Sequence, residues 1–181
     1  MNCRDCDQLI SESSIIDGVE YFTCCSCGGC IKIHLTPQSI GLDILHRKGS
    51  RNTRESFSSD FIVGKKSLLE MLPKAYGSKR EWMGCFARGW DRLNDHSKDQ
   101  LLLLTSPEMD SGRCLIYVCP ECADAGCGAI ACKIKREDGC YIWDSFAYEN
   151  RLDDPDIIEG VGPIRFRISE YELLIRQACD L

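Results

Sequence analysis

Residues 114–148 read CLIYVCPECADAGCGAIACKIKREDGCYIWDSFAY, and this stretch decides the fold. The apolar run at 114–118 is typical of a buried strand. A second strand is predicted at 129–134, and the Glu-Asp-Gly sequence at 137–139 predicts a turn into a third strand at 141–148. Because strands joined by so short a connection pair antiparallel, we expect a mainly antiparallel sheet.

The residues on either side of this stretch extend the sheet and add helices. Downstream, apolar residues alternate with arginine at 164–168, which predicts a further strand. The Ser-Glu-Tyr-Glu sequence at 169–172 predicts a capping box for a final helix through Ala178. Upstream, the patterns predict strands at 31–35, 42–45 and 60–64, and helices at 67–76 and 80–94.

A separate cysteine-rich region precedes this domain. Asp17-Gly18, between apolar residues, has the turn chemistry of a β-hairpin. We therefore expect an α+β fold with a small zinc-ribbon-like module at residues 1–30. One α+β domain follows at 31–181, with a mainly antiparallel sheet, two to three helices and a second cysteine cluster at 119–132.

Composition limits the classes of protein that fit the chain. Its 181 residues can bury one sizeable core, and no apolar run approaches the roughly 18 residues that span a bilayer. No secretory signal is found, so a cytoplasmic protein without a membrane partner is expected. The net charge of −6 argues against a general binder of nucleic acid. In a reducing compartment the 14 cysteines favour metal binding or redox chemistry over structural disulfides.

The N-terminal cysteines have the spacing of a zinc site. Cys3-x2-Cys6 and Cys24-x2-Cys27 are separated by seventeen residues, which is within the range of four-cysteine zinc ribbons. An alternative second pair is Cys27-x2-Cys30. Four thiolates would complete a closed tetrahedron, so the zinc ion would be structural, and it would supply much of the folding energy of so small a module.

A second cluster combines Cys119, Cys122, Cys127 and Cys132. Four such ligands could bind zinc, although Cys132 lies inside a predicted strand and could face the core instead. Three thiolates completed by Asp124 or an imidazole are an alternative, as is a redox dithiol of Cys119 and Cys122. The dithiol has less support, because a catalytic C-x-x-C normally begins a helix, whereas this one follows a strand into a loop.

No motif of enzymatic chemistry is found in the chain. The G-x-S-x-G, H-E-x-x-H, P-loop and dinucleotide patterns are absent, and the sequence has only three histidines. We therefore predict a protein that is not an enzyme. A basic middle segment would suit a nucleic-acid-binding zinc-ribbon protein, but it has few aromatic residues for base stacking. Its basic residues are Arg47, Lys48, Arg51 and Arg54.

Three stretches carry a resemblance to a known family: YVCPECADAGCGAI at 117–130, WDSFAYEN at 143–150 and GPIRF at 162–166. They resemble a family of small uncharacterised bacterial proteins, over about residues 113–178. The family pattern has W-S-D-F where this chain exchanges two residues at 144–145. Some members are labelled oxidoreductase, which implies redox chemistry at the cysteines, but the chain has no cofactor motif. In size, acidity and lack of catalytic motifs it is also similar in type to bacterial toxin-immunity proteins.

These features favour a non-enzymatic inhibitor that binds a basic protein partner, such as a toxin nuclease domain. Acidic surfaces attract basic targets rapidly and mimic the charge of phosphate. A cysteine-dependent oxidoreductase or metalloenzyme at Cys119, Cys122 and Cys127 is the alternative. The candidate partner-binding carboxylates are Asp144, Glu149, Asp153, Asp154, Asp156 and Glu159.

Overall fold

The chain forms two compact units, residues 1–37 and residues 38–181, in the computed structural model. The structure describes residues 6–8, 12–16, 19–24, 26–28, 30–34, 36–51, 53–72 and 81–180. No helix in these ranges has both the length and the apolar character needed to cross a bilayer.

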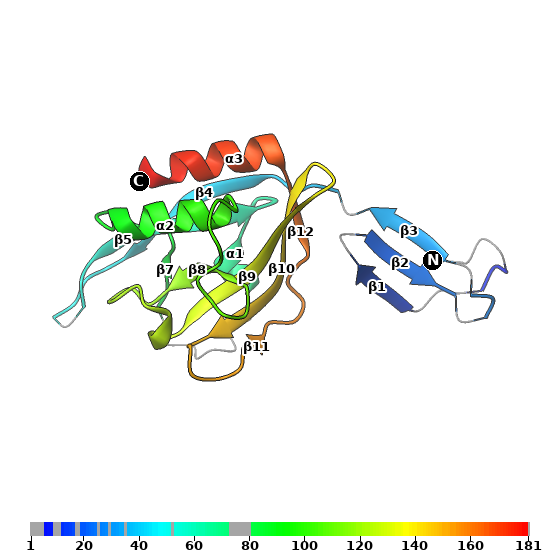
Figure 1. Cartoon of the computed structure of the whole chain (residues 1–181), viewed down its shortest axis with the longest axis horizontal. Coiled ribbons are helices and arrows are strands. Elements are labelled where there is room, and N and C mark those ends of the chain that lie inside the picture. The colour runs from blue at the N-terminus through cyan, green and yellow to red at the C-terminus, as the bar shows by residue number, and fades with distance from the viewer. Residues whose placement is uncertain are drawn as a thin grey trace. The chain divides into compact units, whose positions relative to one another are not determined.

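The N-terminal unit contains a three-stranded antiparallel sheet in the order β1-β2-β3 (Figure 1). Ile16 pairs with Val19, so β1 and β2 form the predicted hairpin, although residues 17 and 18 lie outside the described ranges. The prediction that residues 31–35 belong to the main sheet is wrong, because β3 pairs with β2 along its whole length. Alternation identified a strand but not its partner, and the unit extends past residue 30. The strands are β1 (Glu12–Ile16), β2 (Val19–Thr23) and β3 (Cys30–His34).

The main unit contains two sheets, and within each sheet the paired strands are antiparallel. The larger sheet has the order β11-β10-β9-β8-β7, with β12 also paired to β10, and the smaller has the order β4-β5-β6. The α+β fold with a mainly antiparallel sheet is thus confirmed, including the three strands of the 114–148 stretch. The strands are β4 (Ile40–Arg47), β5 (Ser56–Val63), β6 (Lys66–Ser67), β7 (Met83–Gly84), β8 (Cys114–Val118), β9 (Ala129–Glu137), β10 (Cys140–Glu149), β11 (Asp156–Ile157) and β12 (Ile164–Arg167).

The two sheets meet where β5 passes β7. Ser59 N donates to Phe86 O at 2.8 Å. A Cβ atom on Gly84 would lie 1.8 Å from Ser59 O, so only glycine allows the two backbones to approach so closely. This contact holds the first part of the predicted 80–94 helix as an extended segment. That prediction is wrong, and helix α2 occupies Asp91–Leu101 instead.

Helices α2 and α3 lie side by side against the larger sheet (Figure 1). Helix α3 begins at Ile168, so the predicted capping box at 169–172 is wrong and Ser169 lies inside the first turn. Only part of the predicted 67–76 helix is confirmed: α1 covers Leu68–Met71 and is capped by Ser67 Oγ, Leu72 is extended, and residues 73–76 lie outside the described ranges. The helices are α1 (Leu68–Met71), α2 (Asp91–Leu101), α3 (Ile168–Gln177), and the 3₁₀ turns η2 (Ala125–Cys127) and η3 (Ala178–Asp180).

Aromatic side chains fill the core between the sheets and the helices. Trp143 is fully buried and meets the ring edges of Phe61 and Phe166 at centroid distances of 5.0 and 5.4 Å. Its indole Nε1 donates to Tyr171 Oη at 3.0 Å, which satisfies the polar atom of the largest core residue. Because this core lies wholly within the main unit, we expect that unit to have its own folding stability.

Candidate metal centre

A tight turn immediately after β8 presents two thiols. Ala123 N donates to Cys119 O at 2.8 Å, and Ala123 has a φ of 55°, in the left-handed region. The backbone N–H groups of Glu121 and Cys122 donate to Cys119 Sγ. This arrangement points backbone dipoles at sulfur and so favours the thiolate form that binds metals.

A 3₁₀ turn returns a third thiol to the same place. Asp124 Oδ1 caps η2 by accepting from Gly126 N at 2.6 Å, and Cys127 ends that turn. Cys122 Sγ and Cys127 Sγ are 3.4 Å apart, and all three sulfurs lie within 4.8 Å of one another. Sulfurs at tetrahedral positions about 2.3 Å from zinc are about 3.8 Å apart, so this group could hold a metal ion with little movement.

The fixed position of the third thiol depends on the glycine that follows it. Gly128 has a φ of 96°, and a Cβ atom there would lie 2.3 Å from Tyr148 Oη. Glycine is therefore required both by the backbone conformation and by the tyrosine ring packed over it. Gly128 follows η2 and immediately precedes β9, so it connects the turn that carries Cys127 to that strand.

The N-terminal unit repeats the same turn. Gly28 N donates to Cys24 O at 2.8 Å, and Gly28 has a φ of 71°. Backbone N–H groups of Cys27 and Ser26 lower the pKa of Cys24 to about 6. Cys6 Sγ lies 3.5 Å from Cys24 Sγ, and the sulfurs of Cys6, Cys24 and Cys27 form a second group that could hold a metal ion.

Two predictions about this N-terminal site stay open. Cys3, the fourth predicted ligand, lies outside the described residues. The alternative ligand Cys30 begins β3, but its side chain is not described. Within the described part of this unit, Cys24 and Cys27 are the pair that the structure brings together.

The thiols of the main-unit group differ in pKa because their hydrogen bonds differ. Burial raises the pKa of Cys119, but the N–H groups of Glu121 and Cys122 outweigh it, so this pKa is lowered overall. The Asp124 N–H lowers the pKa of Cys122, but burial and the adjacent thiols raise it to about 11. The Cys119 thiolate therefore forms readily, and a bound cation would displace the proton of Cys122.

The prediction that Cys132 is the fourth ligand of this cluster is wrong. Cys132 lies on β9 directly opposite Cys114 of β8, and both side chains belong to the hydrophobic core. Burial raises the pKa of Cys114 to about 12 and that of Cys132 well above its usual range. A thiol held neutral in an apolar core is a packing residue and not a metal ligand.

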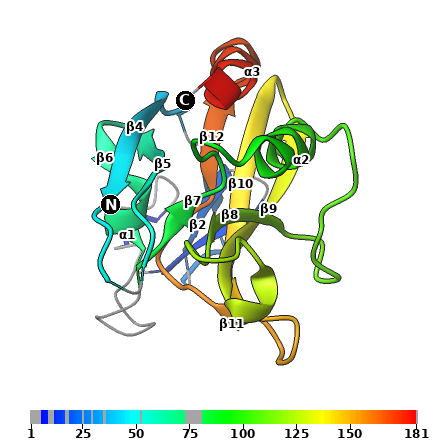
Figure 2. The same cartoon turned by 90° about the vertical axis from the view of Figure 1, so that its left-hand side faces the viewer.

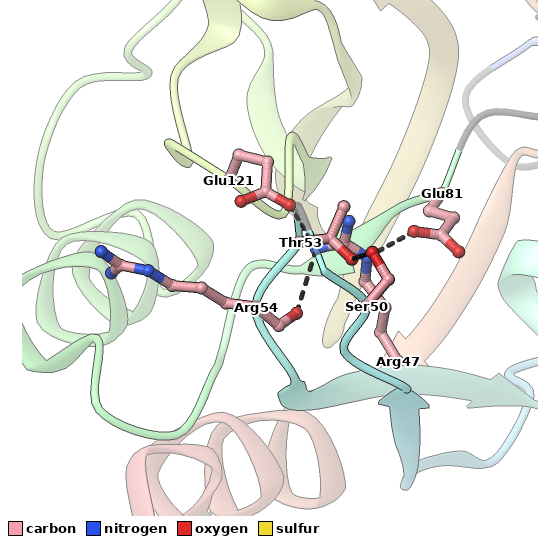
Figure 3. Close-up of polar contacts among 6 residues, drawn as sticks. All are labelled: Arg47, Ser50, Thr53, Arg54, Glu81 and Glu121. Atoms are coloured by element: carbon pink, nitrogen blue, oxygen red, sulfur yellow. Dashed lines mark hydrogen bonds and ion pairs between the residues drawn. The ribbon is translucent and has the colours of Figure 1, made fainter.

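An ion pair anchors the cysteine turn to the smaller sheet (Figure 3). Arg47 Nη1 lies 2.7 Å from Glu121 Oε1 and 3.3 Å from Arg54 O, and the same guanidinium pairs with Glu81. The Arg47 side chain is only 8% exposed. The sequence indicated Arg47 only as part of a basic middle segment and did not predict this role, because no local pattern links it to Glu121.

The six predicted partner-binding carboxylates differ in exposure. Glu149 is buried, pairs with Arg113 at 3.2 Å and accepts from Ser111 Oγ at 2.6 Å. Its assignment to a binding surface is therefore wrong, because its charge is already neutralised inside the protein. Asp144 is half-buried and accepts from Ser145 N. The exposed members are Asp153, Asp154, Asp156 and Glu159.

The exposed carboxylates lie at the same end of the larger sheet as the three thiols. Glu149 pairs with Ala129, so β10 ends beside the start of β9, two residues after Cys127. Figure 2 shows η2 next to the loop that connects β10 to β11. The thiol group and the acidic loop are therefore neighbours on one end of the main unit.

No protein-family model matches the chain, and neither does any curated protein or solved structure with which it was compared. The resemblance to small bacterial proteins stays a prediction. Functional inference therefore rests on the residues and their geometry.

Proposed function

We propose that this is a zinc-thiolate protein without enzymatic activity, in which each cysteine group holds one structural zinc ion. The observation that carries the proposal is the repetition of one turn in the two units. In both, a C-x-x-C sequence directs two backbone N–H groups at its first sulfur. In both, the residue after the second cysteine has positive φ and donates to the first carbonyl.

Zinc is the metal that these donors favour. Cysteine thiolates suit zinc, copper(I) and iron–sulfur clusters, whereas calcium and magnesium prefer oxygen ligands. In each group a C-x-x-C turn is joined by a third cysteine, and such cysteine-rich ligand sets are typical of structural zinc. The proposal also accounts for the third thiol at Cys127, which a simple redox dithiol would not need.

Metal analysis of the purified full chain tests the proposal. We expect about two zinc ions per chain, one of which is lost in Cys6→Ser and one in Cys119→Ser. Cys179→Ser is the matched control, because Cys179 lies outside both groups, and it should keep both ions. Protein without metal whose thiols all titrate would contradict the proposal. Disulfide reduction that disappears in Cys119→Ser would favour the oxidoreductase alternative.

The acidic loop beside the thiols supports a second proposal, that the zinc-stabilised end of the main unit binds a basic protein such as a toxin nuclease domain. Asp153, Asp154 and Asp156 are exposed, and Leu152 beside them is 85% exposed. A large apolar side chain flanked by exposed carboxylates suits a binding surface with charge complementarity.

Charge reversal tests this surface. Replacing Asp153, Asp154 and Asp156 by lysine should slow association with a basic nuclease domain and weaken its salt dependence, while the fold stays intact. A control with the same charge change at the exposed Asp91, Asp95 and Asp110 should have a smaller effect. Equal effects of the two triple variants would place the interface elsewhere. If the chain bound nucleic acid as tightly as it bound the nuclease domain, the alternative of a nucleic-acid-binding zinc-ribbon protein would be favoured.

A further inference from the structure

We infer that the metal centre of Cys119, Cys122 and Cys127 keeps its fourth coordination position for a thiolate supplied from outside the main unit. This inference rests on the metal binding proposed above. The structural basis is a group of three convergent thiols, two of them exposed, for which the main unit supplies no fourth donor.

The other cysteines of the main unit are committed elsewhere. Cys85, Cys114, Cys132 and Cys140 are buried. Cys179 Sγ lies 3.7 Å from Asn94 O. Within the described part of this unit, no further cysteine joins the group of three.

The histidines and nearby carboxylates are also engaged. His46 Nε2 lies 2.8 Å from Glu55, and His96 Nε2 lies 2.8 Å from the Gln100 side chain. Among the carboxylates next to the thiols, Glu121 pairs with Arg47 and Asp124 caps η2. The predicted completion of the site by Asp124 or an imidazole therefore has no support among the described residues of this unit.

The rest of the main unit cannot supply the missing ligand either. Its residues outside the described ranges are 52, 73–80 and 181. Their sequence contains no cysteine, histidine, aspartate or glutamate. A four-coordinate metal at this centre must therefore bind water or a donor from elsewhere.

A thiolate suits this position better than water does. Three thiolates already reduce the effective charge of the cation, so it polarises water weakly and prefers a soft donor. In the binding step, an incoming thiol releases its proton to solvent, its sulfur bonds to the metal, and the bound water leaves. The turn at residues 119–128 carries two carboxylates, and because Arg47 neutralises Glu121, the negative charge beside the site comes from Asp124 and from the three thiolates. This local charge favours a thiol that carries a positive group over one that carries a negative group.

Cobalt(II) substitution tests the inference, because thiolate-to-cobalt absorption grows with the number of Co–S bonds. The test protein is the full chain with Cys3, Cys6, Cys24, Cys25, Cys27 and Cys30 replaced by serine, so no N-terminal thiol can act as the fourth ligand. It should bind one cobalt ion. Added cysteamine should then increase the absorption by about a third, as three Co–S bonds become four. At low salt and equal thiolate concentration, cysteamine should bind about fivefold more tightly than 3-mercaptopropionate.

The outcomes separate the two proposals. Failure to bind cobalt would contradict the metal centre itself. Cobalt binding with no spectral response to either thiol would overturn the open position, provided that a chelator assay shows the cobalt still bound. If this centre had four Co–S bonds in the unmodified chain but only three in the serine variant, the fourth ligand would be an N-terminal cysteine. That result would overturn the inference that the fourth thiolate comes from another molecule. Tighter binding of 3-mercaptopropionate would overturn the charge preference.

Discussion

Arg47 Nη1 lies 2.7 Å from Glu121 Oε1, so a nearly buried guanidinium on β4 fixes the turn that presents the thiols. The two residues are far apart in sequence: Arg47 ends β4 of the smaller sheet, and Glu121 lies in the turn that follows β8 of the larger sheet. The position of the proposed metal centre therefore depends on the packing of the smaller sheet as well as on its own loop.

Replacing Arg47 by methionine should loosen the cysteine turn, because Glu121 and Glu81 both lose their cation. We expect a loss of about 1–2 kcal/mol in the free energy of unfolding, since both carboxylates are partly exposed. Zinc affinity should fall about tenfold, as is typical when a residue that supports metal ligands is removed. Denaturant titration and competition with a chromophoric chelator measure the two effects. Arg54→Met, which keeps the carbonyl contacted by Arg47, should change neither.

Ala123 and Gly28, which follow the two C-x-x-C sequences with positive φ, should respond in opposite directions to exchange between alanine and glycine. Ala123→Gly should stabilise the metal-free main unit by about 1 kcal/mol, because glycine relieves the cost of a left-handed alanine. Gly28→Ala should weaken zinc binding in the N-terminal unit for the opposite reason. Thermal melts and zinc competition check the pair. A destabilising Ala123→Gly would mean that the turn is not held in this conformation.

Cys132 and Cys119 should respond differently to substitution. Cys132→Ala should keep the zinc content unchanged but lower the free energy of unfolding by about 1 kcal/mol, because it leaves a small void in the core. Cys119→Ser should lose one zinc ion. Metal analysis of folded protein separates the two roles, and loss of zinc in Cys132→Ala would restore it as a ligand.

The thiols of the main-unit centre should differ in reactivity once metal is removed. The pKa of Cys119 is lowered, so it carries more thiolate at neutral pH than an ordinary cysteine. The pKa of Cys122 is raised to about 11, so it stays protonated until the pH approaches that value. Iodoacetamide at pH 7 should therefore modify Cys119 first, although Cys122 is more exposed. Peptide mass spectrometry over time reads the order, and added zinc should protect both thiols.

Glu149 should behave as a core residue and not as part of a binding surface. Glu149→Ala leaves the buried Arg113 guanidinium without its carboxylate partner and should cost about 3–5 kcal/mol. Asp153→Ala on the exposed loop should change the free energy of unfolding by less than about 0.5 kcal/mol. Denaturant titration compares them, and similar small losses would mean that the Arg113–Glu149 pair is not buried in solution.

Local patterns in the sequence determined much of the fold. Apolar runs and turn residues identified the three strands at 114–148, because strand formation and short turns depend on neighbouring residues. The C-x-x-C spacing identified both cysteine groups for the same reason, since a four-residue turn brings two thiols together by itself.

Only the tertiary structure decided which strands pair, which cysteine joins each group and which carboxylates are exposed. The segment at 80–94 has helical spacing, yet Gly84 packs against Ser59 and holds it extended. Cys132 has the residue type of a metal ligand and Glu149 that of a surface charge, but Cys132 is buried opposite Cys114 on β8 and Glu149 is buried against Arg113. Strand pairing and burial depend on the free energies of contacts between residues that are distant in sequence. A local sequence pattern therefore does not predict them.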